Sequence, residues 1–458
     1  MYVSQKIKLD LTTEQKFIFE NYFGQARFIY NRSIDVCREM FNKYCEERKL
    51  GKKAKEINNL WPDLSHLLKN VRAKYRDEEW DKDWDIKINK NIFESCVEYS
   101  LRAFEAKFGS NKESYKSNYS YFLKYRSKKS GKYSFTFKDK GTTSKIFLFT
   151  DKRIALPSFS GRWYSTNGIQ GWCNYHGTLK LKEPIRKIFV DAGIRKILRA
   201  TIKRCGSSYF IILQLELSEN PYKSLPKNPT TKAIGIDLGI KTLIAAVNDD
   251  GKEFTYNVPN LKKYEKKIKR LQRLLDRKRD YFVKRNPNEE YIESNAYKKT
   301  LILLQNTRLK RNNILETFYH QKTKEFLKDY DIICMEDLKS GFMHKRHNLA
   351  SAKMRKGNRL YEIRRMLERK SILYDRTLIK VDRFYASTQT CSLCGNRKKD
   401  VKDKKGKIVK KNKLDLSDRD YYCSNPKCYY HTHPIDRDLN AAINILREGL
   451  DIAGYELI

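Results

Sequence analysis

Two acidic residues stand in stretches of sequence that are otherwise apolar, and they limit the folds open to this chain. Asp237 lies in Ala233-Ile-Gly-Ile-Asp-Leu-Gly239, and Glu336 ends Ile332-Ile-Cys-Met-Glu336. Short continuous apolar runs of this kind are typical of buried strands. An ionised carboxylate in such a strand is costly unless it is paired or bound to a metal ion. We therefore expect each acid to have a partner of one of these kinds.

The second half of the chain alternates between strands and helices. From Thr231 onward, the apolar runs and helical spacings predict strands at 233–239, 243–247, 253–257, 331–338 and 378–381, and helices over 261–284, 297–328, 350–374 and from Asp438 to Arg447. The first of these helices has a very basic outer face. This alternation favours an α/β domain.

The first half has a different pattern. Residues 1–10 predict a strand, Thr12 or Thr13 is a candidate cap for a helix that starts near Glu14, and 91–108 predicts a second helix. The stretch 50–90 is rich in charge and Trp and fits neither class. Short strands are expected from about 118 to 217, with a hairpin that turns at Gly206-Ser207-Ser208. Prolines then mark a linker, at Pro221, Pro226 and Pro229.

A third acid lies near the C-terminus, in Asp436-Arg-Asp-Leu-Asn-Ala-Ala-Ile-Asn444, where a helix with small residues is predicted. The residues alone leave open whether Asp436 or Asp438 is the functional acid. Carboxylates bind hard cations such as Mg²⁺, and two such ions can stabilise both oxygens of an in-line phosphodiester hydrolysis. The alternative is three separate structural roles: a turn, an ion pair and a helix cap.

The charge of the chain favours a polyanionic partner. Lys and Arg number 96 against 55 Asp and Glu, which gives a formal net charge of +41 over 458 residues. Nucleic acid is the expected partner, because Lys and Arg release the counterions condensed on phosphates. A membrane surface fits less well, since the basic residues are not concentrated in one amphipathic helix. Aromatic residues beside basic ones suit stacking on bases, although core packing explains most of them.

Four of the ten cysteines form two close pairs, Cys391-Ser-Leu-Cys394 and Cys423-Ser-Asn-Pro-Lys-Cys428. Two thiolate pairs in turns can close a tetrahedral Zn²⁺ site, and such a site is structural because no position is left open. His431 and His433 stand close by, so one of them could replace a cysteine. The other cysteines show no ligand spacing, and core packing is their expected role.

No apolar run is long enough to predict a transmembrane helix, and the N-terminus has no signal-peptide pattern. We expect an intracellular, reducing compartment and no disulfide framework. In a prokaryote this would be the cytoplasm or nucleoid, and in a eukaryote the nucleus.

Five segments together resemble TnpB, the OrfB-type protein of insertion sequences, which is related to type V CRISPR effectors and to Fanzor proteins. In chain order they are Gly24-Gln-Ala-Arg-Phe-Ile-Tyr-Asn31, Gly235-Ile-Asp-Leu-Gly-Ile-Lys-Thr242, Met335-Glu-Asp-Leu338, Ser387-Thr-Gln-Thr-Cys-Ser-Leu-Cys-Gly395 and Asp436-Arg-Asp-Leu-Asn-Ala-Ala442.

The resemblance implies a multidomain protein. It has an α/β RNase H-like (RuvC) nuclease domain with a zinc ribbon insert, and an N-terminal β-barrel wedge domain with an inserted helical recognition domain. By position, the wedge would be 1–8 and 131–226, the recognition domain 9–130, the nuclease domain 230–390 and 429–458, and the zinc ribbon, a target-nucleic-acid-binding domain, 391–428.

The resemblance also implies an RNA-guided DNA endonuclease with a guide RNA and target double-stranded DNA as partners, in which pairing with the guide selects the sequence. It matches Asp237, Glu336 and Asp438 to the three catalytic acids, which would hold two Mg²⁺ ions. The family pattern Asp-x-Asn-Ala-Ala matches Asp438, and not Asp436, to the third catalytic acid. Asp436 would then be a supporting residue or a helix cap. Cys391, Cys394, Cys423 and Cys428 match the ligands of one structural Zn²⁺. A monomeric protein in the ribonucleoprotein is expected.

Three other functions are compatible with parts of this pattern. A guided DNA-binding repressor could use the same fold, but relatives of that kind are expected to have lost catalytic acids, and this chain keeps all three. A transposase acting directly in strand transfer is compatible with the fold. A plain zinc-ribbon binding protein would leave Asp237 and Glu336 unexplained.

Overall fold

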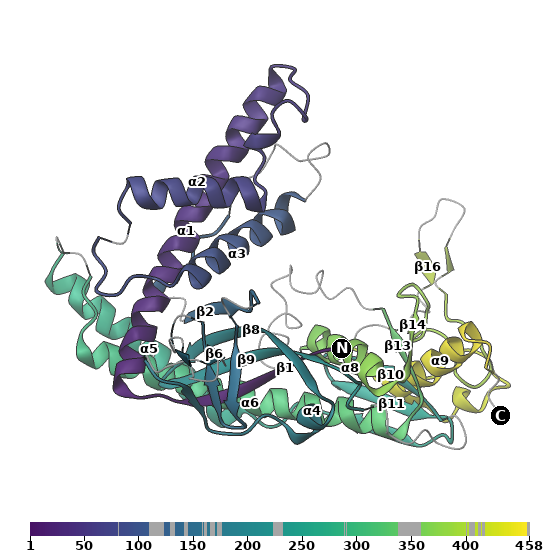
Figure 1. Ribbon diagram of the computed structural model, residues 1–458. Coiled ribbons are helices and arrows are strands. Elements are labelled where there is room, and N and C mark those ends of the chain that lie inside the picture. Colours follow the sequence, from purple (N-terminus) through teal and green to yellow (C-terminus); the bar gives the residue numbers. More distant parts are fainter. Residues whose placement is uncertain are drawn as a thin grey trace. The chain divides into compact units, whose positions relative to one another are not determined.

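The computed structural model of the chain divides into two compact units (Figure 1). Unit 1 comprises Met1–Asn220 and Ile268–Leu309, and unit 2 comprises Pro221–Lys267 and Lys310–Ile458. The structure describes residues 1–455 apart from 81, 110–122, 129–132, 142–144, 158, 160–162, 165–169, 172–175, 223–231, 288, 290, 338–358, 400, 403–407, 411–413 and 415–416. Cys173, the linker prolines 226 and 229 and the expected helical segment 350–358 therefore lie outside the described residues.

Unit 1 contains an antiparallel sheet of seven strands in the order β2-β8-β9-β1-β7-β4-β3. Their bounds are β1 Tyr2–Asp10, β2 Tyr133–Lys138, β3 Phe147–Thr150, β4 Arg153–Ala155, β7 Leu179–Leu181, β8 Ile194–Cys205 and β9 Ser208–Leu217. Two-residue strands β5 Trp163–Tyr164 and β6 Gln170–Gly171 form a separate pair, and α4 covers Lys187–Asp191. The expected hairpin is β8–β9. The sequence predicts it over Ile202–Leu217 with a turn at Gly206; the turn is where predicted, and the first strand begins earlier, at Ile194.

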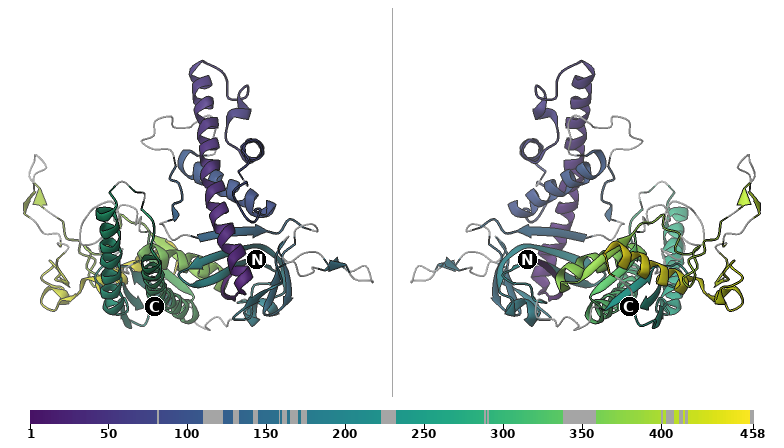
Figure 2. Two further views of the ribbon diagram at one scale, coloured as in Figure 1. Left: turned by 90° about the vertical axis from the view of Figure 1, so that its left-hand side faces the viewer. Right: turned by 90° about the vertical axis from the view of Figure 1, so that its right-hand side faces the viewer.

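The sheet is curled (Figure 2), and β1 changes partner along its length. Its residues 2–8 pair with β9, and Leu9 and Asp10 pair with β7. Alternate residues of β1 are buried, as the alternating sequence predicts. Among the described strands, the end strands β2 and β3 are not paired with each other, so hydrogen bonds do not close the sheet into a barrel.

Three helices of unit 1 are α1 Thr13–Lys49, α2 Leu64–Asp77 and α3 Lys90–Phe108, and a short 3₁₀ turn covers Asn58–Leu60. Thr12 is the N-terminal cap of α1. The Thr12 hydroxyl accepts from the Gln15 backbone N–H, and the Gln15 side-chain oxygen accepts from the Thr12 backbone N–H, which makes a capping box. The structure thus decides between the two predicted caps. It also places a helix, α2, in the stretch that the sequence left unassigned.

The Gly24–Asn31 motif lies on α1 and holds two segments without regular secondary structure against that helix. A Cβ on Gly24 would stand 2.9 Å from the Trp84 ring, and the Gln25 amide donates to the carbonyl of Ile86 at 2.5 Å. The Asn31 side chain bonds both the backbone carbonyl and the backbone N–H of Arg126, at 3.0 and 2.8 Å. In the described residues, this motif therefore has a structural role: it attaches these two segments to α1.

Two long helices follow the first hairpin of unit 2: α5 Lys262–Arg285 and α6 Asn295–Asp329. Both were predicted, with the ends shifted by a few residues. Leu271 and Leu275 of α5 pack with Leu304 of α6. The basic residues of α5 are exposed, as expected from its amphipathic pattern, except Lys278, which is half-buried and donates to the Ala296 carbonyl and the Thr300 hydroxyl of α6.

Unit 2 is built on a five-stranded sheet in the order β12-β11-β10-β13-β14. The strands are β10 Ala233–Asp237, β11 Ile244–Asn248, β12 Glu253–Tyr256, β13 Ile332–Glu336 and β14 Thr377–Val381, close to the predicted ranges. The first three are antiparallel neighbours, whereas β13 and β14 run parallel to β10. Consequently the carboxyl ends of β10, β13 and β14 lie at one edge of the sheet.

Helices cover both faces of this sheet. Residues such as Ile236 and Met335 pack in one cluster with side chains of α6 and of α8, Leu360–Tyr374. The opposite face carries small residues and packs against α9, Arg437–Ile452. Among the described residues, no helix has the length and apolar character needed to span a membrane.

Glycine lets α9 lie close to the strands. A Cβ on Gly235 would stand 2.3 Å from the Ala442 carbonyl oxygen, and one on Gly449 would stand 2.4 Å from the Cys334 sulfur. Contacts this short cannot be relieved by rotating a flexible side chain, because the first is with backbone. The Gly235 of the apolar strand is thus required by the helix that carries Asp438.

Candidate metal centres

Asp237 and Glu336 are the last residues of neighbouring parallel strands. In the ladder between β10 and β13, Ile236 is paired with Met335, so the two acids that follow are level with each other. Parallel strands place their carboxyl ends at one edge, where α/β proteins commonly bind ligands. The structure thus brings together two residues that are about a hundred positions apart in sequence.

Asp438 approaches the same edge from α9. Asp436 is the cap of this helix, and its Oδ1 accepts from the backbone N–H groups of Asp438 and Leu439 at 2.8 and 3.2 Å. Asp438 itself is buried, and a Cβ on Gly239, just past β10, would lie 4.0 Å from its Oδ2. Asp436 is therefore committed to capping, and Asp438 is the acid directed toward Asp237.

The electrostatics of these acids fit a site that needs a cation. Burial, followed by the negative charges of Asp438 and Glu336, raises the pKa of Asp237 to about 7. Burial and the adjacent carboxylate of Asp337 raise the pKa of Glu336 to about 7 as well. Repulsion and desolvation both disfavour the ionised forms, so a bound divalent cation would relieve both effects.

Two arginines lie beside Asp438, and the sequence did not predict either of them as part of the site. Arg437 Nη2 lies 3.5 Å from its Oδ1, and Arg419 Nη1 lies 3.8 Å from its Oδ2. Arg437 is next to Asp438 in sequence and could have been suspected from that. Arg419 lies in the long insert between the cysteine pairs, where no sequence signal separates it from the other basic residues.

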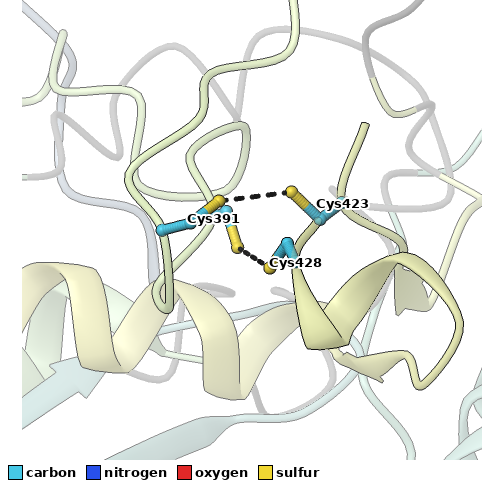
Figure 3. A group of neighbouring side chains, drawn as sticks. Cys391, Cys423 and Cys428 are labelled. Carbon is cyan, nitrogen blue, oxygen red and sulfur yellow. Dashed lines mark hydrogen bonds between the residues drawn. The ribbon is translucent and has the colours of Figure 1, made fainter. Parts of the chain in front are cut away.

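Four cysteine sulfurs form the other centre (Figure 3). The Sγ atoms of Cys391, Cys394, Cys423 and Cys428 all lie within 4.8 Å of one another. Cys391 Sγ is 3.7 Å from Cys428 Sγ, and Cys394 Sγ is 3.5 Å from Cys423 Sγ. A tetrahedron of Zn–S bonds of about 2.3 Å separates its sulfurs by about 3.8 Å, so this group fits a zinc site. A disulfide would require about 2.05 Å.

Local hydrogen bonds favour the thiolate form of Cys394, whereas burial raises the pKa of Cys391 to about 12 and also raises the pKa of Cys423. Burial raises the pKa of Cys394, but the backbone N–H of Asn396 and the neighbouring thiols outweigh it and lower the pKa to about 7. The backbone N–H of Asn425 points at Cys423 Sγ at 3.4 Å. Thiolates are the ligands of Zn²⁺, and the convergence of the four sulfurs is the observation that supports metal binding.

The two histidines that could have replaced a cysteine face other groups. His431 Nδ1 lies 2.8 Å from the Cys423 carbonyl oxygen, and the His433 ring stacks on Tyr429 with ring centroids 4.2 Å apart. Within the described part of the chain, only the four cysteines converge tightly enough to form a metal-binding group. Neither histidine belongs to that group, and neither do the three carboxylates.

Two asparagines of α9 join the cysteine turn to the helix that carries Asp438. The Asn440 side chain accepts from the Ser392 N–H at 2.9 Å and donates to the Thr390 carbonyl at 2.8 Å. Asn444 donates to the carbonyls of Ser387 and Thr390 at 2.8 and 2.7 Å. Sequence reasoning missed this role, although two Asn at helical spacing among buried alanines was an available signal.

Short strands extend this ribbon. β15 Val401–Lys402 pairs with β16 Ile408–Lys410, and β17 Asp420–Tyr421 pairs with β18 Ile435–Asp436, with a 3₁₀ turn at Tyr429–His431 between these last two. Buried Tyr421 packs among the cysteines. β18 runs directly into α9, so the ribbon is continuous with the helix that carries Asp438.

Three family models match the chain. Residues 361–445 match the Cas12f1-like TNB domain, residues 213–347 match OrfB of IS605, described as a probable transposase, and residues 1–49 match a domain described as helix-turn-helix. In this chain the last region is a strand followed by one uninterrupted helix, α1 (Figure 2).

Two curated relatives and one solved structure are similar over long stretches. A protein of Escherichia coli (strain K12) with the provisional name RNA-guided DNA endonuclease InsQ is 26% identical over 66% of this chain and 70% of its own length. The CRISPR-associated endodeoxyribonuclease Cas12f2 of a Micrarchaeota archaeon is 26% identical over 48% of this chain and 37% of its own. The structure of a Cas12f1-sgRNA-target DNA complex matches 95% of this chain and 83% of that chain, with a TM-score of 0.52 and 17% identity. That likeness shows the fold alone.

Proposed function

The chain belongs to the TnpB-type (OrfB) family of insertion-sequence proteins, and on this premise we propose that it is an RNA-guided DNA endonuclease. The observation that supports this most is the acidic edge of the unit 2 sheet. Asp237 and Glu336 end neighbouring parallel strands, and Asp438 approaches from α9 with small residues beneath it. A structural role for three such acids would not require them to share one edge.

We assign unit 2 to a RuvC-like (RNase H-fold) nuclease domain with a zinc ribbon insert. Its support is the order of three antiparallel strands followed by two parallel ones, with helices on both faces. The proposed ranges are 230–390 and 429–458 for the nuclease domain and 391–428 for the ribbon. They include 268–309, the paired parts of α5 and α6, which belong to unit 1 in the structure. In unit 1, the curled sheet supports a wedge domain at 1–8 and 131–226, and α1, α2 and α3 support a recognition domain at 9–130.

Asp237, Glu336 and Asp438 would hold two Mg²⁺ ions, which when bound stabilise the attacking and leaving oxygens of an in-line phosphodiester hydrolysis. The chain contributes by holding the three carboxylates at one edge. The ladder between β10 and β13 fixes the level of Asp237 and Glu336. The Asp436 cap fixes the first turn of α9, and through it the position of Asp438.

The long insert contributes Arg419, which lies near Asp438. A guanidinium there reduces the repulsion between the acid cluster and an incoming phosphodiester, because it offsets one negative charge of the cluster. Cys391, Cys394, Cys423 and Cys428 would hold one structural Zn²⁺. That ion would fix the ends of the insert, and with them the base of the segment that carries Arg419.

The exposed face of α5 supports a nucleic-acid partner. Lys263, Lys266, Arg270, Arg273 and Arg277 are all exposed and recur at intervals of three and four residues, which places them on one side of the helix. Such a stripe suits the phosphates of a guide RNA or a target DNA duplex. A monomeric ribonucleoprotein is the simplest assembly for this proposal.

The test begins with co-expression of the chain and the RNA that flanks its coding sequence. The purified complex is sequenced for bound RNA, and it is then offered DNA that matches the guide next to randomised flanks, with Mg²⁺. We expect one RNA species to copurify and cleavage to require both the matching sequence and a short adjacent motif. Absence of copurifying RNA, or cleavage that ignores the guide sequence, would contradict the proposal.

A further inference from the structure

The turn that follows β14 lies at the same sheet edge as the acids. Glu336 of β13 is paired with Val381, the last residue of β14, and the Asp337 N–H donates to the Val381 carbonyl at 2.9 Å. Since β14 runs parallel to β13, the chain leaves the sheet at the acidic edge. Its next residues are Asp382, Arg383, Phe384 and Tyr385.

This turn buries one aromatic ring and presents the other to solvent. Tyr385 packs against the apolar cluster between the sheet and α9, and its N–H donates to the Asp382 carbonyl at 3.0 Å. The Phe384 N–H donates to Asp382 Oδ1 at 2.6 Å, and Phe384 is 75% exposed. A ring this exposed contributes little to the core, so packing does not account for it.

A cation accompanies the exposed ring. The Arg383 guanidinium lies over the Phe384 ring, 4.5 Å from its centroid. Arg383 is itself exposed, and no carboxylate forms an ion pair with it among the residues that the structure describes. An aromatic face with an adjacent free guanidinium is the combination that binds an unpaired base and its phosphate.

We propose that Arg383 and Phe384 form a stacking post that holds an unpaired base of the DNA strand entering the acidic edge. This inference rests on the proposed function, which supplies a reason for single-stranded DNA at that edge. The ring stacks on the base, and the guanidinium contacts the neighbouring phosphate. Because every base has an aromatic face, the post is insensitive to sequence, as a nuclease directed by a guide requires.

The test uses an oligodeoxynucleotide carrying 5-iododeoxyuridine, which crosslinks under ultraviolet light to aromatic side chains stacked on it. The full chain is irradiated with the single-stranded probe, and the crosslinked peptide is identified by mass spectrometry. We expect the crosslink at Phe384, and a loss of about tenfold in affinity for the probe in Phe384→Ala. Phe384→Trp should retain both, because it keeps a stacking face.

Ile372→Ala is the matched control, since Ile372 is also 75% exposed and lies in the last turn of α8, before β14, whereas Phe384 lies after β14. It should bind and crosslink like the wild type. Crosslinking of the same probe should fall sharply when it is annealed into a duplex. Equal crosslinking and affinity in Phe384→Ala, or equal crosslinking of the duplex, would overturn the stacking post. Since the readout needs neither guide nor cleavage, failure of the proposed function would appear separately, in the guided cleavage assay.

Discussion

The two candidate metal centres of unit 2 differ in how completely the protein chain forms them. Four cysteine sulfurs lie within 4.8 Å of one another, and asparagines of α9 hold the turn that contains two of them. The three carboxylates share an edge but do not converge to that spacing, and two of them have raised pKa values. A closed site suits a structural ion, whereas a reaction centre must leave room for substrate and its metals.

The cysteine centre should show the largest effect of substitution. Cys423→Ser is expected to reduce bound zinc from about one ion per chain to almost none, because structural sites derive about 10 kcal/mol or more of folding free energy from the ion. Metal analysis and proteolysis within 391–428 measure the change. Cys205→Ser, a partly exposed cysteine outside the cluster, is the control and should keep its zinc. Full zinc occupancy in Cys423→Ser would refute a four-cysteine site.

Gly235→Ala tests whether close packing of α9 positions the acidic edge. The added Cβ would meet the Ala442 carbonyl oxygen at 2.3 Å, so we expect destabilisation of about 1–3 kcal/mol in a denaturant titration. Cleavage should fall as well, since α9 carries Asp438.

Gly251→Ala is the companion variant for that experiment. Gly251 has a φ of +77° and nothing within 4 Å of an added Cβ, so it should cost about 1–2 kcal/mol through backbone strain alone. Its guided cleavage should be unchanged. Equal losses of cleavage in the two variants would contradict the claim that close packing of α9 against Gly235 positions the acids.

The raised pKa values predict how the stability of the metal-free chain depends on pH. The unfolded carboxyls ionise near pH 4, whereas those of Asp237 and Glu336 retain their protons to about pH 7 in the folded chain. The folded state therefore binds more protons between these values, and the stability that these groups contribute is lost as pH rises from about 4 to 7. Melting curves without divalent metal should show this loss, and Asp237→Asn should reduce it.

Adding Mg²⁺ at pH 8 should raise the melting temperature of the wild type, since binding to the folded state alone stabilises it. The increase should be smaller in Asp237→Asn. A melting temperature that responds equally to Mg²⁺ in both chains would place the metal elsewhere.

The smallest effect is expected at His431. Because its ring contacts the Cys423 carbonyl and not the sulfur group, His431→Ala should keep about one zinc per chain. Loss of the hydrogen bond should cost about 0.5–1.5 kcal/mol, measured by thermal unfolding. Loss of the zinc in this variant would mean that the histidine is a ligand, which was the alternative left open by the sequence.

Much of unit 2 could be predicted from the sequence because its signals are local. Apolar runs gave the strands, and helical spacing gave α5 and α6 to within a few residues. The two Cys pairs were recognisable from spacing alone. The sequence near Asp237 and Glu336 could not predict that the two acids lie side by side, because the register between β10 and β13 depends on the whole sheet.

Other features were missed because their causes are tertiary. Helix α2 lies in a stretch whose many charges and Trp residues hid its apolar positions, Leu67 and Val71. In unit 1, β1 changes partner along its length, which alternation alone does not reveal. Arg419 reaches Asp438 only because β17 pairs with β18 at the start of α9.

The role of the acidic edge is tested most directly by single-turnover cleavage of guide-matched DNA with Asp237→Asn. We predict that the variant complex binds this DNA like the wild type but cleaves it more than about a hundredfold more slowly, beyond the 10–100-fold cost typical of an outer-shell change. Asp451→Asn, an exposed acid in the last turn of α9, should cleave normally. Cleavage by Asp237→Asn at the wild-type rate would contradict the assignment of this edge as the site of DNA hydrolysis.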